Sequence, residues 1–288
     1  LLVISYHGLF LGTAVGFLGS ALLVVSVALP YSRSKEPTVS IGRKLTSGIR
    51  IYLATPRLRG LLALTMTAAA GSALVIVNTV VIVRDGLARP ESAVAMALAA
   101  FGAGSMAMAF VLPKLLARRT DRSVMMSAGT ALSLILIIIA VIWPLLTVAT
   151  RWPILLGSWL LLGMTYSALV TPGGRLLRRS SSDQDRPALF AAQFSLSHAC
   201  WLVAYPVVGW MGAKVGITAA LWAMAVLAVL GVVVAYRLWP REEPDSLAHS
   251  HGDLPADHPH LLEHRKAADE PHSHAYVIDN LHTQWPVK

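Results

Sequence analysis

Seven long apolar blocks, separated by polar connections, constrain this chain more than any other feature. The blocks lie at roughly 7–30, 61–83, 93–113, 124–146, 152–171, 188–211 and 216–238. Each is about as long as the ~20 residues that an α-helix needs to cross a bilayer. Of the 288 residues, 55% are hydrophobic and only 14% are charged, more apolar surface than a soluble fold of this size could bury. We therefore expect an all-α, multi-spanning membrane protein with seven transmembrane helices.

Basic residues alternate between the connections. The connections 31–60, 114–123 and 172–187 hold 15 Lys and Arg residues, whereas the alternate connections hold four. The positive-inside rule predicts that the rich connections, and with them the C-terminus, are cytoplasmic. We therefore expect a multi-pass protein of the cell inner (plasma) membrane. The rule also explains the basic body without nucleic acid, for which no motif is present.

The same pattern divides the chain into four parts. Residues 1–30 form one spanning helix, 31–60 a basic cytoplasmic loop, 61–240 a bundle of six spanning helices, and 241–288 a polar tail. Within the loop, apolar residues recur every four positions from Ile41 to Leu53 with basic residues between them, which predicts an amphipathic helix at the membrane surface. Because the chain starts at Leu1 without a signal-peptide pattern, we expect a fragment that lacks its N-terminal part.

One helix, a long basic loop and six further helices, together with two stretches of sequence, suggest a family. The stretches are LPKLLARRTDRSVM at 112–125 and TPGGRLLRRSSSDQDRPALFAAQFSLSHACWLVAYPVVGW at 171–210. The chain resembles the C-terminal half of a major facilitator superfamily transporter, helices six to twelve, and 171–210 is most similar to nickel-resistance exporters with a histidine-rich tail. The resemblance implies alternating access around a site near the midplane, between two six-helix halves.

In the resemblance, the basic stretch 112–125 is the loop between helices eight and nine. Charged residues of such loops pair with neighbouring helices and bias the inward-facing against the outward-facing state. Arg119, Asp121 and Arg122 suit that conformational switch. The alternative is a plain basic loop that only sets the orientation.

Polar groups inside a membrane are costly, so each requires an explanation. His198 and Cys200 lie near the middle of the block 188–211, about 200° apart around a helix, so they cannot bind one ion unaided. His198 shares a face with Trp201 and Tyr205 and is the only obvious deep titratable group, hence a candidate for proton coupling. The predicted substrate-pathway residues are His198, Gln193, Cys200, Trp201, Tyr205, Asn78 and Tyr166. The alternative for each is hydrogen-bonded packing.

The tail holds eight of the ten histidines, interspersed with carboxylates. They are His249, His251, His258, His260, His264, His272, His274 and His282, and six of them form three His-x-His pairs. Imidazole beside carboxylate suits nickel, cobalt, zinc or copper, so the tail is a predicted metal-binding region that we expect to be disordered without its ligand. The alternative is a solvated tail that happens to be histidine-rich.

Three functions remain open. The first is a secondary active exporter of a divalent metal cation, nickel or cobalt, with protons as coupling ion. The second is an exporter of drugs, siderophores or other organic compounds with an incidental or regulatory tail. The third is a metal sensor or scaffold that transports nothing. The sequence has no phosphate-binding loop and no nucleophile motif. We therefore expect neither an enzyme nor a bound cofactor, and membrane lipid, substrate and protons as partners.

Overall fold

A computed structural model describes residues 6–27, 41–241, 246–250, 271–274, 276–279, 281–282 and 284–286. The chain divides into two units, Leu1–Ser40 and Ile41–Lys288. The described part of the first unit is one helix, α1 (Tyr6–Ser26), with an apolar stretch over Phe10–Ser26. All the contacts discussed below lie within the second unit.

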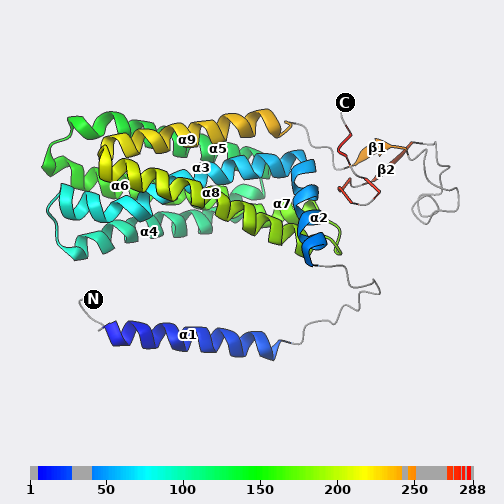
Figure 1. Ribbon diagram of the computed structural model, residues 1–288, viewed down its shortest axis with the longest axis horizontal. Helices are drawn as coiled ribbons and strands as arrows, with labels where there is room; N and C mark the ends of the chain where they lie inside the picture. Colours follow the sequence, from blue (N-terminus) through cyan, green and yellow to red (C-terminus); the bar gives the residue numbers. More distant parts are fainter. Residues whose placement is uncertain are drawn as a thin grey trace. The chain divides into compact units, whose positions relative to one another are not determined.

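Six long apolar helices form the body of the second unit (Figure 1). They are α3 (Pro56–Val80), α4 (Glu91–Leu116), α5 (Asp121–Ile142), α6 (Val148–Val170), α8 (Arg186–Lys214) and α9 (Ile217–Leu238). A π-helical turn, η1 (Val81–Gly86), extends α3, and a short 3-10 turn, η2 (Trp143–Leu145), follows α5. Each of the six helices is long and apolar enough to cross a membrane, which confirms the predicted all-α membrane fold. Seven spans were predicted, and the seventh corresponds to the shorter apolar stretch Phe10–Ser26 of α1.

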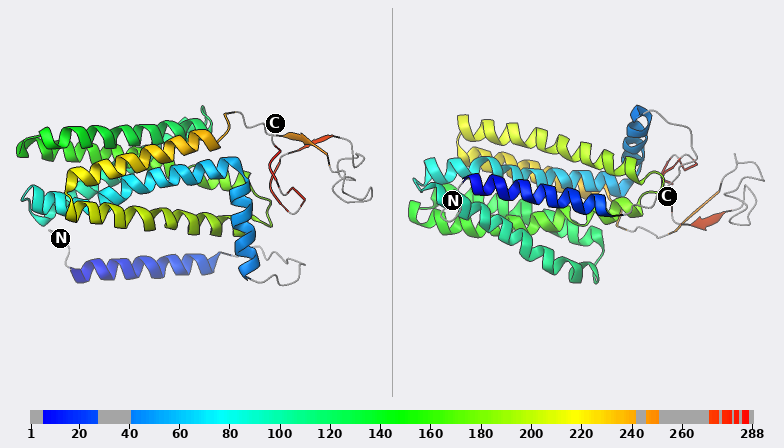
Figure 2. Two further views of the ribbon diagram at one scale, coloured as in Figure 1. Left: turned by 45° about the horizontal axis from the view of Figure 1, so that its top comes forward. Right: turned by 90° about the horizontal axis from the view of Figure 1, so that it is seen from below.

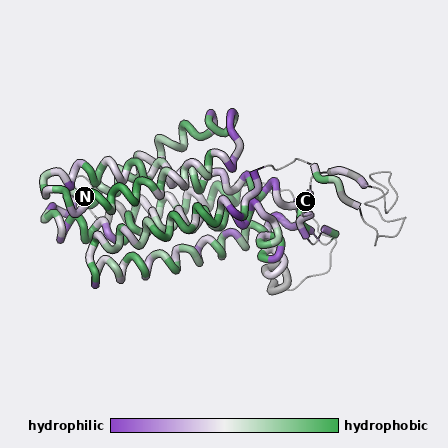
Figure 3. Tube along the Cα trace, turned by 90° about the horizontal axis from the view of Figure 1, so that it is seen from above, coloured by the Kyte–Doolittle hydropathy of each residue, from purple (hydrophilic) through white to green (hydrophobic). Residues whose placement is uncertain are grey.

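Polar structure gathers at one end of this bundle, which we call the basic end. It comprises α2 (Ile41–Ala54), α7 (Gly173–Arg179), and the connections 117–120 and 180–185. Figure 3 shows hydrophilic residues concentrated there, whereas the helices are hydrophobic along most of their length. The amphipathic periodicity of 41–53 thus corresponds to a helix, which crosses the ends of the bundle helices in both views of Figure 2.

The helix α3 is the centre of the bundle. It contacts α4, α5, α6, α8 and α9, and most of its residues are buried.

Glycine residues allow the backbones of α4 and α6 to approach each other closely. A Cβ atom at Gly104 of α4 would overlap the carbonyl of Leu160, and one at Gly163 of α6 would overlap the carbonyl of Phe101. The backbones of α4 and α6 therefore touch at these glycines, as is common between membrane helices.

The described part of the tail also has structure. Strands β1 (Leu247–His249) and β2 (His272–His274) pair antiparallel. Nearer the C-terminus, 276–286 packs against the bundle, where Ile278 is fully buried and the Trp285 ring lies 5.3 Å from the guanidinium carbon of Arg57 at the start of α3. Disorder of the tail in the absence of ligand stays a prediction, and the apolar and aromatic residues near the C-terminus pack against the core.

Candidate substrate-pathway face

Polar and aromatic side chains of four helices form two groups of contacts, one between α8 and α3 and one between α6 and α4. We call this set the aromatic face: Ser72 of α3, Phe101 of α4, Tyr166 of α6, and His198, Trp201 and Tyr205 of α8. Its three α8 members recur at intervals of three and four residues, which places them on one side of the helix. The face therefore contains His198, Trp201, Tyr205 and Tyr166, four of the predicted pathway residues.

Direct contacts connect the members of this face. The Trp201 indole donates a hydrogen bond to the Ser72 hydroxyl at 2.9 Å, joining α8 to α3. The Tyr166 ring lies 5.6 Å from the Phe101 ring, joining α6 to α4. The central helix α3 contacts both α8 and α6, and Tyr205 and His198 of α8 are exposed.

His198 is held in one orientation by its own helix. Its Nδ1 lies 2.7 Å from the carbonyl oxygen of Phe194, and the centroids of the two rings lie 4.1 Å apart, with the ring planes tilted by 37°. Because a carbonyl oxygen can only accept, Nδ1 carries the hydrogen in this arrangement. In a neutral imidazole Nε2 is then the unprotonated nitrogen. His198 can therefore accept a proton or bind a cation through Nε2.

Two other predicted pathway residues of α8 lie away from this face. The Cys200 thiol is buried and donates to the carbonyl of Leu196 at 3.4 Å. Gln193 accepts a hydrogen bond from the hydroxyl of Tyr52 in α2. Burial raises the pKa of that phenol, so Tyr52 remains a donor at any physiological pH. The structure therefore separates Cys200 from His198, as their spacing predicts, and gives Gln193 a partner at the basic end.

Asn78 of α3 is buried between helices. Its amide nitrogen lies 3.4 Å from the carbonyl of Val208 in α8, and a Cβ atom on Gly212 would touch its side-chain oxygen. Only 2% of Asn78 is exposed, so its polar group is used for helix packing in this conformation.

The predicted switch residues connect helices at the basic end. Asp121, at the start of α5, lies 3.4 Å from Nε of Arg175 in α7. Arg122 donates to the carbonyl of Trp239, just after α9, at 3.2 Å. Arg119 is exposed. These pairs connect α5 to α7 and to the end of α9, and the switch role of the three residues stays a prediction.

The tail histidines are only partly within the described residues. His251, His258, His260 and His264 lie outside them. Among the others, the strand register places His249 directly opposite His272 and Leu247 opposite His274. No group of three or more metal-binding side chains occurs within the part of the chain that the structure describes.

His282 has a different environment. It is 4% exposed, and its Nδ1 lies 3.0 Å from the carboxylate of Asp279, which also accepts from the backbone N–H groups of Leu281 and His282. Burial alone would raise the pKa of Asp279, but these hydrogen bonds outweigh it and lower the pKa to about 2. Asp279 is thus a carboxylate that organises the terminal turn.

Sequence reasoning missed several partners because they are distant in the chain. Ser72, Phe101, Arg175 and Tyr52 had no local signal, since each becomes notable only through a contact with another helix. Arg57 was counted as one of many loop arginines. It is buried and donates to the hydroxyl of Ser180 at 2.7 Å. Burial of its charge distinguishes Arg57 from the other arginines of the connections, and burial cannot be determined from the sequence alone.

Comparison with known proteins agrees with the resemblance at the level of the superfamily. The family model of the Major Facilitator Superfamily matches residues 61–271, from the start of the bundle into the tail. No curated protein and no solved structure matches the chain. Because the model covers well over half of the chain, the protein belongs to the Major Facilitator Superfamily of secondary membrane transporters.

Proposed function

We propose that the protein exports a divalent metal cation, nickel or cobalt, by alternating access coupled to proton entry. The observation that carries the proposal is the geometry of His198. Its Nδ1–H is engaged by the Phe194 carbonyl, and Nε2 is the free nitrogen on an exposed face two residues from the middle of α8. A histidine held in this way by a backbone carbonyl is the usual form of an imidazole metal ligand.

Proton coupling needs a group that binds proton and cargo in turn. Glu91 and Asp121 are the first residues of their helices, and Asp85 lies near the end of the π-helical turn. Among the described residues of α3 to α9, His198 is the one Asp, Glu or His away from helix ends. An imidazole with a free Nε2 holds either a proton or a borderline metal ion, so the two compete for one atom.

We assign the tail the role of collecting metal at the transporter's entrance. In an antiparallel pair, directly opposite positions are neighbours on one face of the ladder. The register of β1 and β2 gives His249 and His272 that relation. The contact between Trp285 and Arg57 keeps the far end of the histidine-rich stretch close to the basic end. We place this end in the cytoplasm because its connections hold most of the basic residues.

The direct test is the metal content of cells that express the complete protein. Cells loaded with nickel, cobalt, zinc and copper are analysed by elemental mass spectrometry, with and without residues 241–288. We expect selective depletion of nickel or cobalt, weakened when the tail is removed. Unchanged content of all four metals, with the protein present in the membrane, would contradict metal export. Liposomes that contain the protein in inverted orientation would take up the same metal if the protein is a transporter and would not if it is a sensor.

A second candidate is an exporter of organic compounds. It is favoured by the aromatic character of the face, where Phe194 is 66% exposed beside His198, since aromatic surfaces bind flat organic molecules. It predicts broad drug tolerance that survives deletion of 241–288. Tolerance to drugs without any change in metal content would replace the metal proposal by this one.

A further inference from the structure

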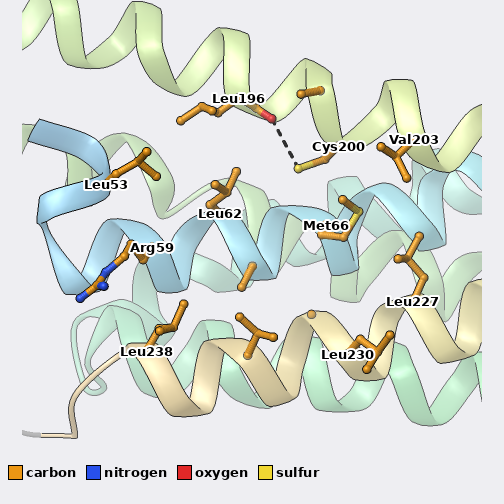
Figure 4. A pocket seen from close by; sticks show the side chains of 14 residues that line it. Leu53, Arg59, Leu62, Met66, Leu196, Cys200, Val203, Leu227, Leu230 and Leu238 are labelled. Carbon is orange, nitrogen blue, oxygen red and sulfur yellow. Dashed lines mark hydrogen bonds between the residues drawn. The ribbon is translucent and has the colours of Figure 1, made fainter. Parts of the chain in front are cut away.

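A second site lies on the other side of α8 from His198. It is an apolar groove of about 540 Å³ with α3 as its floor and α8 and α9 as its walls, and Leu53 of α2 lies at one end (Figure 4). We call it the Arg59 groove, because Arg59 is the one charged residue among the fourteen that line it. Its volume falls within the range of small-ligand sites, about 300–1,000 Å³.

The shape of the groove fits a hydrocarbon chain. Its α9 lining runs from Leu227 to Leu238, about 16 Å along a helix, which is close to half of the ~30 Å hydrocarbon core. Val203 and Leu230 of its walls are exposed, so the groove opens sideways from the bundle. A lipid tail from one leaflet can therefore enter it without crossing a polar region.

At the polar end of the groove, one nitrogen of Arg59 lacks a hydrogen-bond partner among the described residues. The Nε atom of Arg59 is buried, yet no hydrogen-bond partner reaches it within the described part of the chain. Figure 4 shows the guanidinium at the end of the groove nearest Leu238, at the start of α3. A buried guanidinium N–H without a hydrogen-bond acceptor is costly, and a phosphate oxygen would supply a charged acceptor. The rest of Arg59 is partly exposed, so a headgroup can reach it.

We propose that the Arg59 groove binds an anionic phospholipid from the leaflet at the basic end. One acyl chain occupies the apolar groove, and the headgroup phosphate pairs with Arg59. A neutral hydrocarbon would leave the Nε atom of Arg59 without an acceptor, and a free phosphate would leave the groove unfilled. Only a molecule with both parts satisfies both observations. The site is separate from the aromatic face and does not depend on what the transporter carries.

The first test is native mass spectrometry of the complete protein in detergent, titrated with phosphatidylglycerol or with phosphatidylcholine of identical acyl chains. We expect the first phosphatidylglycerol to bind about fivefold more tightly, the scale of one arginine acting on an anionic headgroup. Arg59→Gln should remove this preference and Arg59→Lys should retain it. Arg118→Gln, at the exposed connection after α4, is the matched charge control and should leave it unchanged.

A groove-filling variant tests the acyl part independently. Ala199 lines the groove and is exposed, so Ala199→Phe should lower the affinity for both lipids without affecting Arg59. Cys200, the single cysteine in the sequence, also lines the groove and reports on occupancy. Its alkylation by N-ethylmaleimide, followed on the Cys200 peptide, should slow with phosphatidylglycerol in the wild type but not in Arg59→Gln. Equal affinities for the two lipids, or an unchanged preference in Arg59→Gln, would overturn the proposal.

Discussion

Three polar residues of α3 differ from His198 of α8 in their hydrogen-bond partners, although both helices span the bundle. In α3, Thr67 donates to the carbonyl of Ala228 at 3.0 Å, Asn78 reaches Val208, and Thr79 accepts from the indole of Trp159 at 2.8 Å. All three are buried. In α8, His198 is exposed and bonded only within its helix among the described contacts.

This difference follows from where the two helices lie. In the most apolar window of α3, 72% of residues are buried, against 22% for α8. A central helix must satisfy its polar groups against its neighbours, so those groups become packing contacts. A peripheral helix can leave a polar group facing outward. We therefore expect the polar groups of α3 to contribute to stability and His198, as proposed, to contribute to transport.

The largest effect should come from His198→Ala. Even the loss of a ligand's supporting partner typically costs about 10–100-fold, so we expect transport per folded molecule to fall at least tenfold. Metal efflux, normalised to membrane protein level, measures it. Ser197→Ala is the matched control, because Ser197 donates to the same Phe194 carbonyl at 2.8 Å. Unchanged efflux in His198→Ala would remove His198 from the mechanism.

The second prediction concerns the Asp279 carboxylate, which contacts another histidine, His282, in the turn near the C-terminus. Asp279→Ala removes an acceptor used by three donors and should release 276–286, at a cost of about 2 kcal/mol for bonds to a charged group. Hydrogen exchange should rise in that segment and not in α3 to α9. Asp279→Asn keeps an oxygen acceptor and should have a weaker effect. Equal protection in the alanine variant would show that the turn does not depend on this carboxylate.

The same carboxylate sets a pH limit. The pKa of Asp279 is about 2 in the folded chain, below its ordinary 3.8, so its contribution is fully present above pH 3.8 and lost as pH falls through 2. Docking of 276–286 should therefore be constant between pH 5 and 8. Release within that physiological range would assign the change to another group.

Asn78→Ala should have a smaller effect, on stability alone. Interhelical hydrogen bonds in membrane proteins average about 0.6 and reach about 1.7 kcal/mol, so we expect the melting temperature to drop by a few degrees. Transport per folded molecule should be unchanged. A loss of transport larger than the loss of folded protein would move Asn78 to the pathway and break the contrast between α3 and α8.

The smallest effect should be the coupling between Thr79 and Trp159. A double-mutant cycle with Thr79→Val and Trp159→Phe isolates their hydrogen bond, for which we expect about 0.6 kcal/mol. Thermal unfolding in detergent is the measurement. Additive single mutations would mean that this buried pair contributes packing volume and no net bond energy.

Much of the candidate site could be anticipated from helical periodicity. His198, Trp201 and Tyr205 fall on one side of α8 and Cys200 on another, because the side-chain directions in a helix follow from its 3.6-residue turn. The partners of Tyr166 and Trp201 could not be anticipated. Phe101 and Ser72 are 65 and 129 residues away in the chain, so only helix packing brings them together.

The sequence by itself determined the all-α membrane fold and the chemical types of the candidate ligands, and its resemblance pointed to the superfamily. The fold follows from the cost of exposing backbone and charge to hydrocarbon, which acts on each segment locally. Only the tertiary structure decided which polar groups are used up by packing. Asn78 and Gln193 are engaged by other helices. Within the described residues, the ring of His198 is hydrogen-bonded through Nδ1 alone, and the Nε atom of Arg59 has no partner beside an apolar groove. Those outcomes depend on which helix faces are buried against each other, and no single segment carries that information.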